Sequence, residues 1–450
     1  MGLNHERFYY IRSSSHYISN SSHYIRSILQ NRSSFSRYLI KFSCGIKKIP
    51  RYSTYICPMR KITADYIFPI ASKPMKNGVV ILDNDGLILD VRPCLEMNIK
   101  DEVEYHEGII CPGFINAHCH LELSFFKGLL KEHTGLDVFI RDILALNRPE
   151  LAVIEQSIAD AEQEMLSNGI VAVGDISNGN TTYKQKEKQR LNYHTFIEVF
   201  AFDPAKSKDV FDNAMRLFAE YPEGLKKSIT PHAPYSVSDE LFRMITDFSM
   251  QNNAILSIHN QECEGENDLF KTKTGTIFER IKSWGNNMDN FHATGKNSIE
   301  NYLEKMPHSS KTLLVHNTVT TPDDIHWAMA HHPQLYWCFC PNANLYIENK
   351  LPNYQAFLDA HTTCVVGTDS YASNWSLSIL DELKTIAKHA PELPLELLLT
   401  WATKNGAEFL NFDTQLGTLE KGKRPGINLI YDLDMEHLKL TSETKVKRLI

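Results

Sequence analysis

Between residues 109 and 412 of this 450-residue chain, short apolar runs alternate with longer stretches of helical periodicity. Strands that alternate with helices predict an α/β fold with parallel strands, because each helix returns the chain to the same edge of the sheet. Eight runs have the character of strands: Ile109–Ala117, Val171–Ile176, Thr195–Phe200, Ser228–Pro231, Ile255–Ile258, Thr312–Val315, Leu335–Phe339 and Thr363–Thr368. Eight such units in succession predict a (β/α)8 TIM barrel.

The segments on both sides of this region have β character. On the N-terminal side, Ile62–Val91 contains a strand at Gly78–Leu82, a turn at Asp83–Gly86 and a second strand. On the C-terminal side, Gly417–Gly422 resembles a hairpin and Ile427–Tyr431 resembles a strand. We therefore expect residues 59–111 and 413–450 to form one small β-sandwich module beside a barrel of residues 112–412.

Residues 1–58 differ from the rest of the chain in charge. They contain nine Lys or Arg, twelve Ser and one acidic residue, Glu6, a composition that resembles an organellar transit peptide. We favour the alternative of an extension outside the working protein, because no amphipathic period is present and a strand-like pattern begins after Met59. Without these residues, 38 of the 47 basic and 53 of the 54 acidic residues remain, a net charge of −15. That charge disfavours nucleic-acid binding.

The apolar runs and the cysteines indicate the kind of environment in which the protein works. No run of about 18 apolar residues is present, so no membrane-spanning helix is expected. The nine cysteines are odd in number and include no CxxC pair, which argues against a disulfide framework and favours a reducing, cytoplasmic compartment. The oligomeric state stays open, with a homodimer as one option.

Polar side chains stand at the C-terminal ends of the predicted strands. The first strand leads into His118 and His120, and histidines two residues apart can reach one metal only where a strand ends and bends. Later strands lead into His232, into His259 with Glu262 three residues on, into His316 and into Asp369. Each histidine alone is more often structural, but a barrel gathers these strand ends around one pocket. Together they predict a metal site.

Six segments together resemble the amidohydrolase superfamily, in its branch of cytosine, guanine and adenosine-type deaminases and chlorohydrolases. They are Pro112–His120, Pro231–Tyr235, His259–Glu262, Val315–Asn317, Cys340–Asn344 and Gly367–Ser370, and the resemblance extends from Met59 to the C-terminus. Leu121–Ser124 is similar to the same stretch of aminodeoxyfutalosine deaminases. The resemblance implies one divalent metal ion held by His118, His120, His259 and Asp369. It also implies that His316 lies over the metal-bound water, that Glu262 shuttles protons, and that Glu122 and His232 face the substrate.

The ligand chemistry agrees with these implications. Three imidazoles and one carboxylate suit Zn²⁺, the ion we expect, and also Fe²⁺, and coordination lowers the pKa of water from 15.7 to about 7. Binuclear relatives bridge two metals with a lysine at a middle strand end, but strands three and four lead into Val-Phe-Ala-Phe-Asp and Thr-Pro-His-Ala-Pro. We therefore expect a single metal. The paired HxE and PCxxC signature of the other zinc deaminase fold is absent.

We expect an aminohydrolase that releases ammonia from an exocyclic amino group of a purine-like or other N-heterocyclic small molecule. Glu262 would protonate the ring nitrogen, Asp369 would pass a proton from water to the leaving group, and His316 would steady the developing negative oxygen. The same site could expel halide or an amide nitrogen, because its metal and its base serve all these reactions. A non-catalytic scaffold is disfavoured, since it would be free to lose a ligand or Glu262.

For two features of the sequence, a purely structural role remains an alternative to a functional one. Glu262 could form only a surface ion pair, a role for which Glu264 and Glu266 are better candidates. The connection 263–311 predicts either a partial lid or a loop packed down by its aromatic residues, which are Phe270, Phe278, Trp284 and Phe291.

Overall fold

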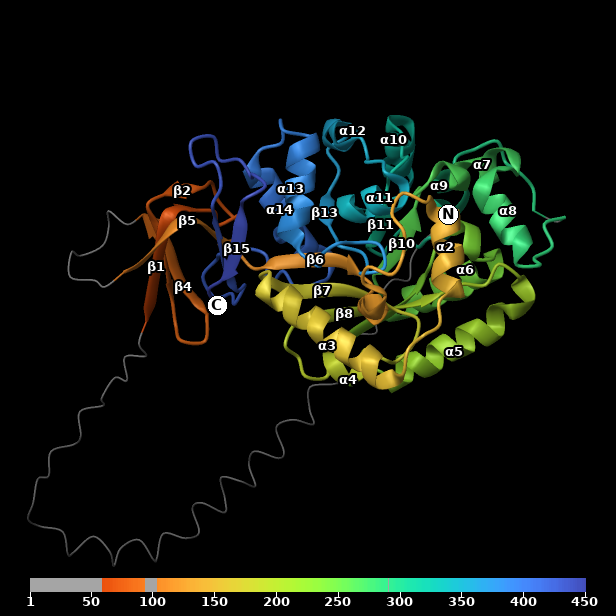
Figure 1. Cartoon of the computed structure of the whole chain (residues 1–450), viewed down its shortest axis with the longest axis horizontal. Coiled ribbons are helices and arrows are strands. Elements are labelled where there is room, and N and C mark those ends of the chain that lie inside the picture. The colour runs from red at the N-terminus through yellow and green to blue at the C-terminus, as the bar shows by residue number, and fades with distance from the viewer. Residues whose placement is uncertain (1–58, 94–102, 290) are drawn as a thin grey trace, which may run out of the picture. The chain divides into compact units, whose positions relative to one another are not determined.

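The computed structural model describes residues 59–93, 103–289 and 291–450. In this part of the chain, eight strands pair in parallel within two four-stranded sheets (Figure 1). One sheet has the order β6 (Phe114–Cys119), β7 (Ile170–Ser177), β8 (Asn192–Val199) and β9 (Lys226–Pro231). The other has the order β10 (Leu256–Asn260), β11 (Thr312–His316), β12 (Leu335–Phe339) and β13 (Cys364–Val366). All these pairings are parallel, so the predicted α/β class with parallel sheets is confirmed.

Hydrogen bonds connect the two sheets at both of their junctions. Beside β9 and β10, the His259 N–H donates to the His232 carbonyl at 2.9 Å. Beside β13 and β6, Thr368 and Asp369 donate their N–H groups to the His118 carbonyl at 3.0 and 3.1 Å. Both sets of bonds lie at the C-terminal ends of strands, so the side chains that follow these strands come close together.

Helices connect the strands and cover the sheets (Figure 1). They are α2 (Leu136–Ala145), α3 (Leu151–Ser167), α4 (Tyr183–Lys186), α5 (Ser207–Glu220), α6 (Asp239–Asn252), α7 (Glu264–Thr272), α8 (Gly275–Ser283), α9 (Ser298–Tyr302), α10 (Pro322–His331), α11 (Pro341–Glu348), α12 (Tyr354–Asp359), α13 (Ile379–His389), α14 (Leu395–Ala402) and α15 (Lys404–Phe409). The apolar face of α3 is buried in the main hydrophobic core and consists of Ile154, Ile158, Ala161 and Met165. No described helix is long and apolar enough to cross a membrane.

The predicted first strand, Ile109–Ala117, is wrong as a single strand. The structure divides it into β5 (Glu104–Pro112), which belongs to a third sheet, and β6. The division falls at Gly113, where an added Cβ would lie 2.3 Å from Val171 Cγ1 and 2.7 Å from the Pro425 carbonyl oxygen. The other seven predicted strands coincide with β7 to β13, with small differences at their ends.

The third sheet has seven strands and takes them from both ends of the described chain. Its order is β15-β14-β5-β1-β3-β4, with β2 paired to β1. The added strands are β1 (Arg60–Ile67), β2 (Met75–Lys76), β3 (Gly78–Leu82), β4 (Ile88–Pro93), β14 (Ile427–Tyr431) and β15 (Lys445–Arg448). The predicted hairpin of β3 and β4 is confirmed, and Asp83 Oδ1 accepts the N–H groups of Asp85 and Leu87 at 2.9 Å in its turn.

The predicted hairpin at Gly417–Gly422 is wrong, because this segment contains no strand. Its backbone bonds instead to a residue just after β1 and to the first residue of β4. Leu419 donates its N–H to the Pro69 carbonyl at 2.9 Å, and Gly422 donates to the Ile88 carbonyl at 2.8 Å. The predicted extension of residues 1–58 lies outside the described residues.

Replacing Gly113 by alanine should destabilise the fold, because the new methyl group would overlap Val171 and the Pro425 backbone. Overpacking of this kind costs about 1–3 kcal/mol, which thermal unfolding reports as a lower Tm. Gly179→Ala is the matched control, because a Cβ there meets nothing within 4 Å. Equal melting temperatures for the two variants would show that the chain accepts a side chain at the break between β5 and β6.

Candidate active site

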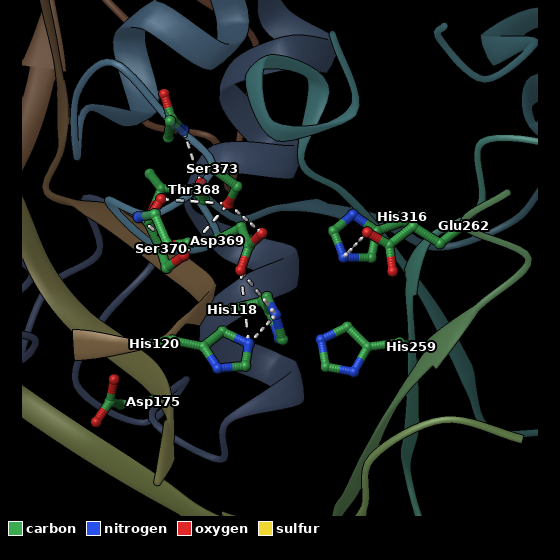
Figure 2. Close-up of polar contacts among 12 residues, drawn as sticks. His118, His120, Asp175, His259, Glu262, His316, Thr368, Asp369, Ser370 and Ser373 are labelled. Atoms are coloured by element: carbon green, nitrogen blue, oxygen red, sulfur yellow. Dashed lines mark hydrogen bonds and ion pairs between the residues drawn. The ribbon is translucent and has the colours of Figure 1, made fainter. Parts of the chain in front are cut away.

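The predicted metal ligands converge on one point (Figure 2). His118 and His120 come from the end of β6, His259 comes from β10, and Asp369 follows β13. The Nε2 atoms of His118 and His120 are 3.1 Å apart, and Asp369 Oδ1 is 3.8 and 3.5 Å from them. One ring nitrogen of His259 lies within 4.8 Å of a ring nitrogen of each of the other two histidines. Lone pairs this close repel each other unless a proton or a cation lies between them.

Burial keeps these histidines neutral. His118 and His120 are 1% and 8% exposed, and burial, followed by neighbouring imidazoles, holds their pKa values well below the ordinary range. Burial also lowers the pKa of His259 to about 4. The neutral imidazole is the form that binds a metal ion, because protonation occupies the lone pair.

Hydrogen bonds orient two of the ligands. The Nδ1 of His259 donates to the His232 carbonyl at 2.8 Å, which leaves Nε2 free for a metal ion. Ser373 Oγ donates to Asp369 Oδ2 at 2.5 Å, so Oδ1 is the oxygen that faces the imidazoles. Burial raises the pKa of Asp369 to about 7, and a nearby cation would favour its charged form. The donor set therefore fits a divalent metal ion.

Four residues at this end of the strands have left-handed backbone conformations, and one of them is Asn317, with a φ angle of 57°. The φ angle is 44° at Gln261, 74° at His316 and 56° at Asp369. A non-glycine residue in this region costs about 1–3 kcal/mol and persists only where its surroundings fix it, commonly at functional sites. Figure 2 shows His316 and Asp369 turned toward the ligand cluster.

Glu262 and His316 face each other beside the ligands (Figure 2). Glu262 Oε1 is 3.6 Å from His316 Nε2. His316 Nδ1 is 2.8 Å from Asn344 Oδ1, and because the Asn344 NH2 group donates to the His316 carbonyl, this oxygen accepts from Nδ1 and leaves Nε2 as an acceptor. Burial, followed by the charge of Asp369, raises the pKa of Glu262 well above its ordinary value. The carboxyl is therefore suited to carry a proton.

The expectation of surface ion pairs is correct for only one of the three neighbouring acids. Glu264 is exposed and pairs with Lys350 Nζ at 2.7 Å. Glu262 is 5% exposed, so the alternative of a surface ion pair is wrong for it. The same expectation is wrong for Glu266, which is fully buried.

A cavity of about 630 Å³ opens onto the ligands. Its inner end is lined by the polar side chains of His120, His232, His259, Glu262, His316 and Asp369. Its outer part is mostly apolar and includes five residues of α2, which are Leu136, Phe139, Ile140, Ile143 and Leu144. From the long connection 263–311, Trp284 lines the cavity, whereas Phe270 is buried in an apolar cluster against which Phe278 and Phe291 pack. The connection thus contributes one aromatic residue to the cavity and packs down the others.

The two predicted substrate contacts lie in different places. His232 lines the cavity, and its Nδ1 is 2.7 Å from Ser236 Oγ. Glu122 is not among the lining residues, because its carboxylate accepts the Asn178 N–H at 3.0 Å behind them. Burial raises the pKa of Glu122 to about 7.

Glu198, at the end of β8, lines the cavity and was not predicted from the sequence. Its carboxylate accepts from the Asn178 side chain at 3.0 Å and lies 3.6 Å from His259 Nδ1. Glu198, His232 and His259 offer a second group of ligand atoms within 4.8 Å of one another. However, His259 Nδ1 already donates to a carbonyl, and its other nitrogen faces the first group, so the geometry favours one metal. The sequence feature that could have identified Glu198 is an acidic residue inside an otherwise apolar strand.

A buried ion pair supports the turn that follows His120. Lys186 Nζ lies 2.5 Å from Asp175 Oδ2, and both side chains are fully buried. Asp175 Oδ1 accepts the Leu121 N–H at 2.8 Å, so the pair ties this turn to β7. Removing either partner would leave an uncompensated buried charge.

A curated relative and two solved structures are similar to most of this chain. The 5-methylthioadenosine/S-adenosylhomocysteine deaminase of Bacillus cereus is 24% identical over 392 residues, which cover 82% of this chain and 84% of the relative. The crystal structure of Helicobacter pylori aminofutalosine deaminase with methylthio-coformycin has a TM-score of 0.70 and 22% identity, over 85% of this chain and 93% of that one. Zinc-bound atrazine chlorohydrolase from Arthrobacter aurescens has a TM-score of 0.66 and 18% identity, over 82% of this chain and 86% of that one. The chain therefore shares the fold of these structures.

A family model identifies the group to which the chain belongs. The model of the amidohydrolase family matches residues 109–448, a span that contains every strand end with a predicted ligand. Because this match covers well over half of the chain, the protein is a member of the amidohydrolase family.

Proposed function

We propose that the chain is a metal-dependent aminohydrolase, which releases ammonia from an exocyclic amino group of a purine-like or other N-heterocyclic small molecule. The observation that carries this proposal is the buried carboxyl of Glu262, 3.6 Å from His316, in a cavity that also contains the ligand side chains. The deaminase names of the curated relative and of the aminofutalosine deaminase structure support the same class of reaction.

The residues of the site divide the reaction among them. When bound, a divalent ion supplies Lewis acidity that lets water lose a proton near neutral pH. The Asp369 carboxylate accepts this proton and later returns it to the departing amino group. Glu262 donates a proton to the ring nitrogen next to the attacked carbon, which makes that carbon electrophilic. His316 Nε2 accepts a hydrogen bond from the attacking water, takes its second proton as the ring carbon is attacked, and in that protonated form steadies the developing negative oxygen. This proton then passes to Glu262, 3.6 Å away, and replaces the one given to the ring nitrogen.

The same site could expel halide or an amide nitrogen. The fold shared with atrazine chlorohydrolase supports this alternative, because that fold accommodates loss of chloride. The two reactions differ in the released product, ammonia or chloride, and an assay of products separates them.

We also propose finer features of the architecture and the cofactor. The hydrogen bonds at both sheet junctions support closure of the two sheets into one (β/α)8 barrel of residues 112–412. The seven-stranded sheet would belong to a β-sandwich module of residues 59–111 and 413–450. Zinc is the proposed ion, supported by the histidine-rich donor set and by the zinc-bound relative. Among the described residues, six cysteines are buried and free, which supports a reducing, cytoplasmic compartment, and a homodimer stays a prediction.

The purified chain should release ammonia from at least one member of a panel of amino-heterocycles, because Glu262 can protonate a ring nitrogen. The panel contains 5-methylthioadenosine, S-adenosylhomocysteine, adenosine, guanine and cytosine, with a chlorotriazine to report halide. Release of chloride without ammonia would favour the alternative. No product from a metal-loaded chain would contradict both reactions.

Elemental analysis should find close to one Zn²⁺ per chain, because only one cluster combines the three histidines with Asp369. His118→Ala and Asp369→Ala should lose the ion and the activity together, since each removes a ligand. His326→Ala is the control, because this histidine is exposed on α10, and it should keep both. Two ions per chain, or full metal content in the His118 variant, would refute the assigned ligands.

Glu262→Gln preserves the shape of the side chain but cannot cycle a proton. Its turnover should fall by about 10² or more, while metal content and substrate binding are kept. Glu264→Gln changes an exposed acid two residues away and serves as the control. A Glu262→Gln variant that deaminates within about threefold of the parent at neutral pH would exclude Glu262 as the proton donor.

A further inference from the structure

Glu266 places a fully buried carboxylate directly behind the turn that carries Glu262. It stands in the first turn of α7 and is 0% exposed. Its Oε1 accepts the Gln261 N–H at 3.0 Å, and its Oε2 accepts the Glu262 N–H at 3.4 Å. One carboxylate thus binds the backbone of the proton-donating residue and of the residue before it.

Helix capping does not account for these two bonds. Cys263 is the N-cap of α7, so Glu266 stands at the third helical position. From that position a capping-box side chain accepts the N–H of the N-cap residue itself. Glu266 instead binds the amides one and two residues before Cys263. Its carboxylate therefore fixes the turn that precedes the helix.

Packing alone does not account for the carboxylate either. Burial raises the pKa of Glu266 to about 7, so its charge is unfavourable there and depends on hydrogen-bond donors such as the two amides. A neutral side chain of similar size would fill the same space without a desolvation penalty.

The turn that Glu266 holds is strained and is fixed from several sides. Gln261 has a left-handed φ of 44°. Its side-chain amide donates to Asn267 Oδ1 at 3.2 Å and to Asp324 Oδ2 at 3.1 Å, and the Val319 N–H donates to its carbonyl at 3.0 Å. Because a strained backbone persists only where its surroundings over-determine it, losing one support lets the turn relax.

We propose that Glu266 is a positioning residue: by binding the Gln261 and Glu262 amides, it holds the Glu262 carboxyl opposite His316. This inference rests on the proposed proton transfer by Glu262. Glu266 is not among the residues that line the cavity, so it acts on the reaction through Glu262 rather than by touching the substrate.

Glu266→Gln replaces one acceptor oxygen by an NH2 group, which cannot accept from an amide. With the panel substrate that the parent turns over fastest, kcat should fall about tenfold, with KM within about twofold and metal content unchanged. Amide hydrogen exchange at Gln261 and Glu262 should become faster. The matched control, Glu264→Gln, changes an exposed acid of the same helical turn and should alter neither kcat nor exchange.

A double-mutant cycle separates positioning from a general structural role. The variant with both Glu262→Gln and Glu266→Gln should turn over within about twofold of Glu262→Gln alone, because the group being positioned is already inactive. An added tenfold loss in the double variant, or unchanged kcat and exchange in Glu266→Gln, would overturn the inference. Loss of metal or of the fold in both Glu266→Gln and Glu266→Asp would overturn it too. Full turnover in Glu262→Gln alone would overturn the proposed function and this inference together.

Discussion

The carbonyl of His118 joins the two ends of the proposed metal site. It accepts the N–H groups of Thr368 and Asp369 at 3.0 and 3.1 Å, so ligands from the two ends of the strand series share one set of backbone bonds. Gly367 permits this approach, because a Cβ there would lie 2.8 Å from the His118 oxygen. The position of Asp369 against the imidazoles, and therefore the whole donor set, depends on that junction.

Around this junction the site is supported by buried charges rather than by apolar packing alone. The Asp175–Lys186 pair holds the turn after His120, and Glu266 holds the turn before α7. A buried carboxylate fixes the backbone around it in one geometry, because its charge must be matched by hydrogen-bond donors at particular distances. The cost of such supports is consistent with a site whose protonating group must be placed to within a fraction of an ångström.

Part of this site could be predicted from the sequence, because the order of the strands is enough to bring its residues together. His118 and His259 lie near the ends of recognisable strands, and Asp369 follows one. The C-terminal ends of parallel strands meet at one face, whatever the length of the chain between them. Glu198 also lies near the end of a strand, and an acid inside an apolar strand was a usable signal for it, but Glu266 could not be predicted in the same way. In a sequence, an acidic residue of a helix that will be buried looks the same as one that will be exposed. Whether it is buried depends on neighbours that only the folded chain brings together.

The division between β5 and β6 was hidden for a different reason. The second half of β5 and the start of β6 are both apolar, and only Gly113 separates them. A single glycine also occurs inside continuous strands. The closeness of Val171 and Pro425 to Gly113, which only the folded chain shows, explains why a glycine stands where the chain passes from one sheet to the other.

The cavity is built from two separate parts of the sequence. Strand ends form its inner, polar end, whereas α2, which contributes no predicted ligand, forms much of its apolar outer part. Substitutions in α2 should alter which molecules fit without moving Glu262 and Asp369, the residues proposed to transfer protons. A lineage with this layout is free to acquire new substrates by changing a ten-residue helix, while the inherited reaction is preserved in a part of the gene that those changes do not touch.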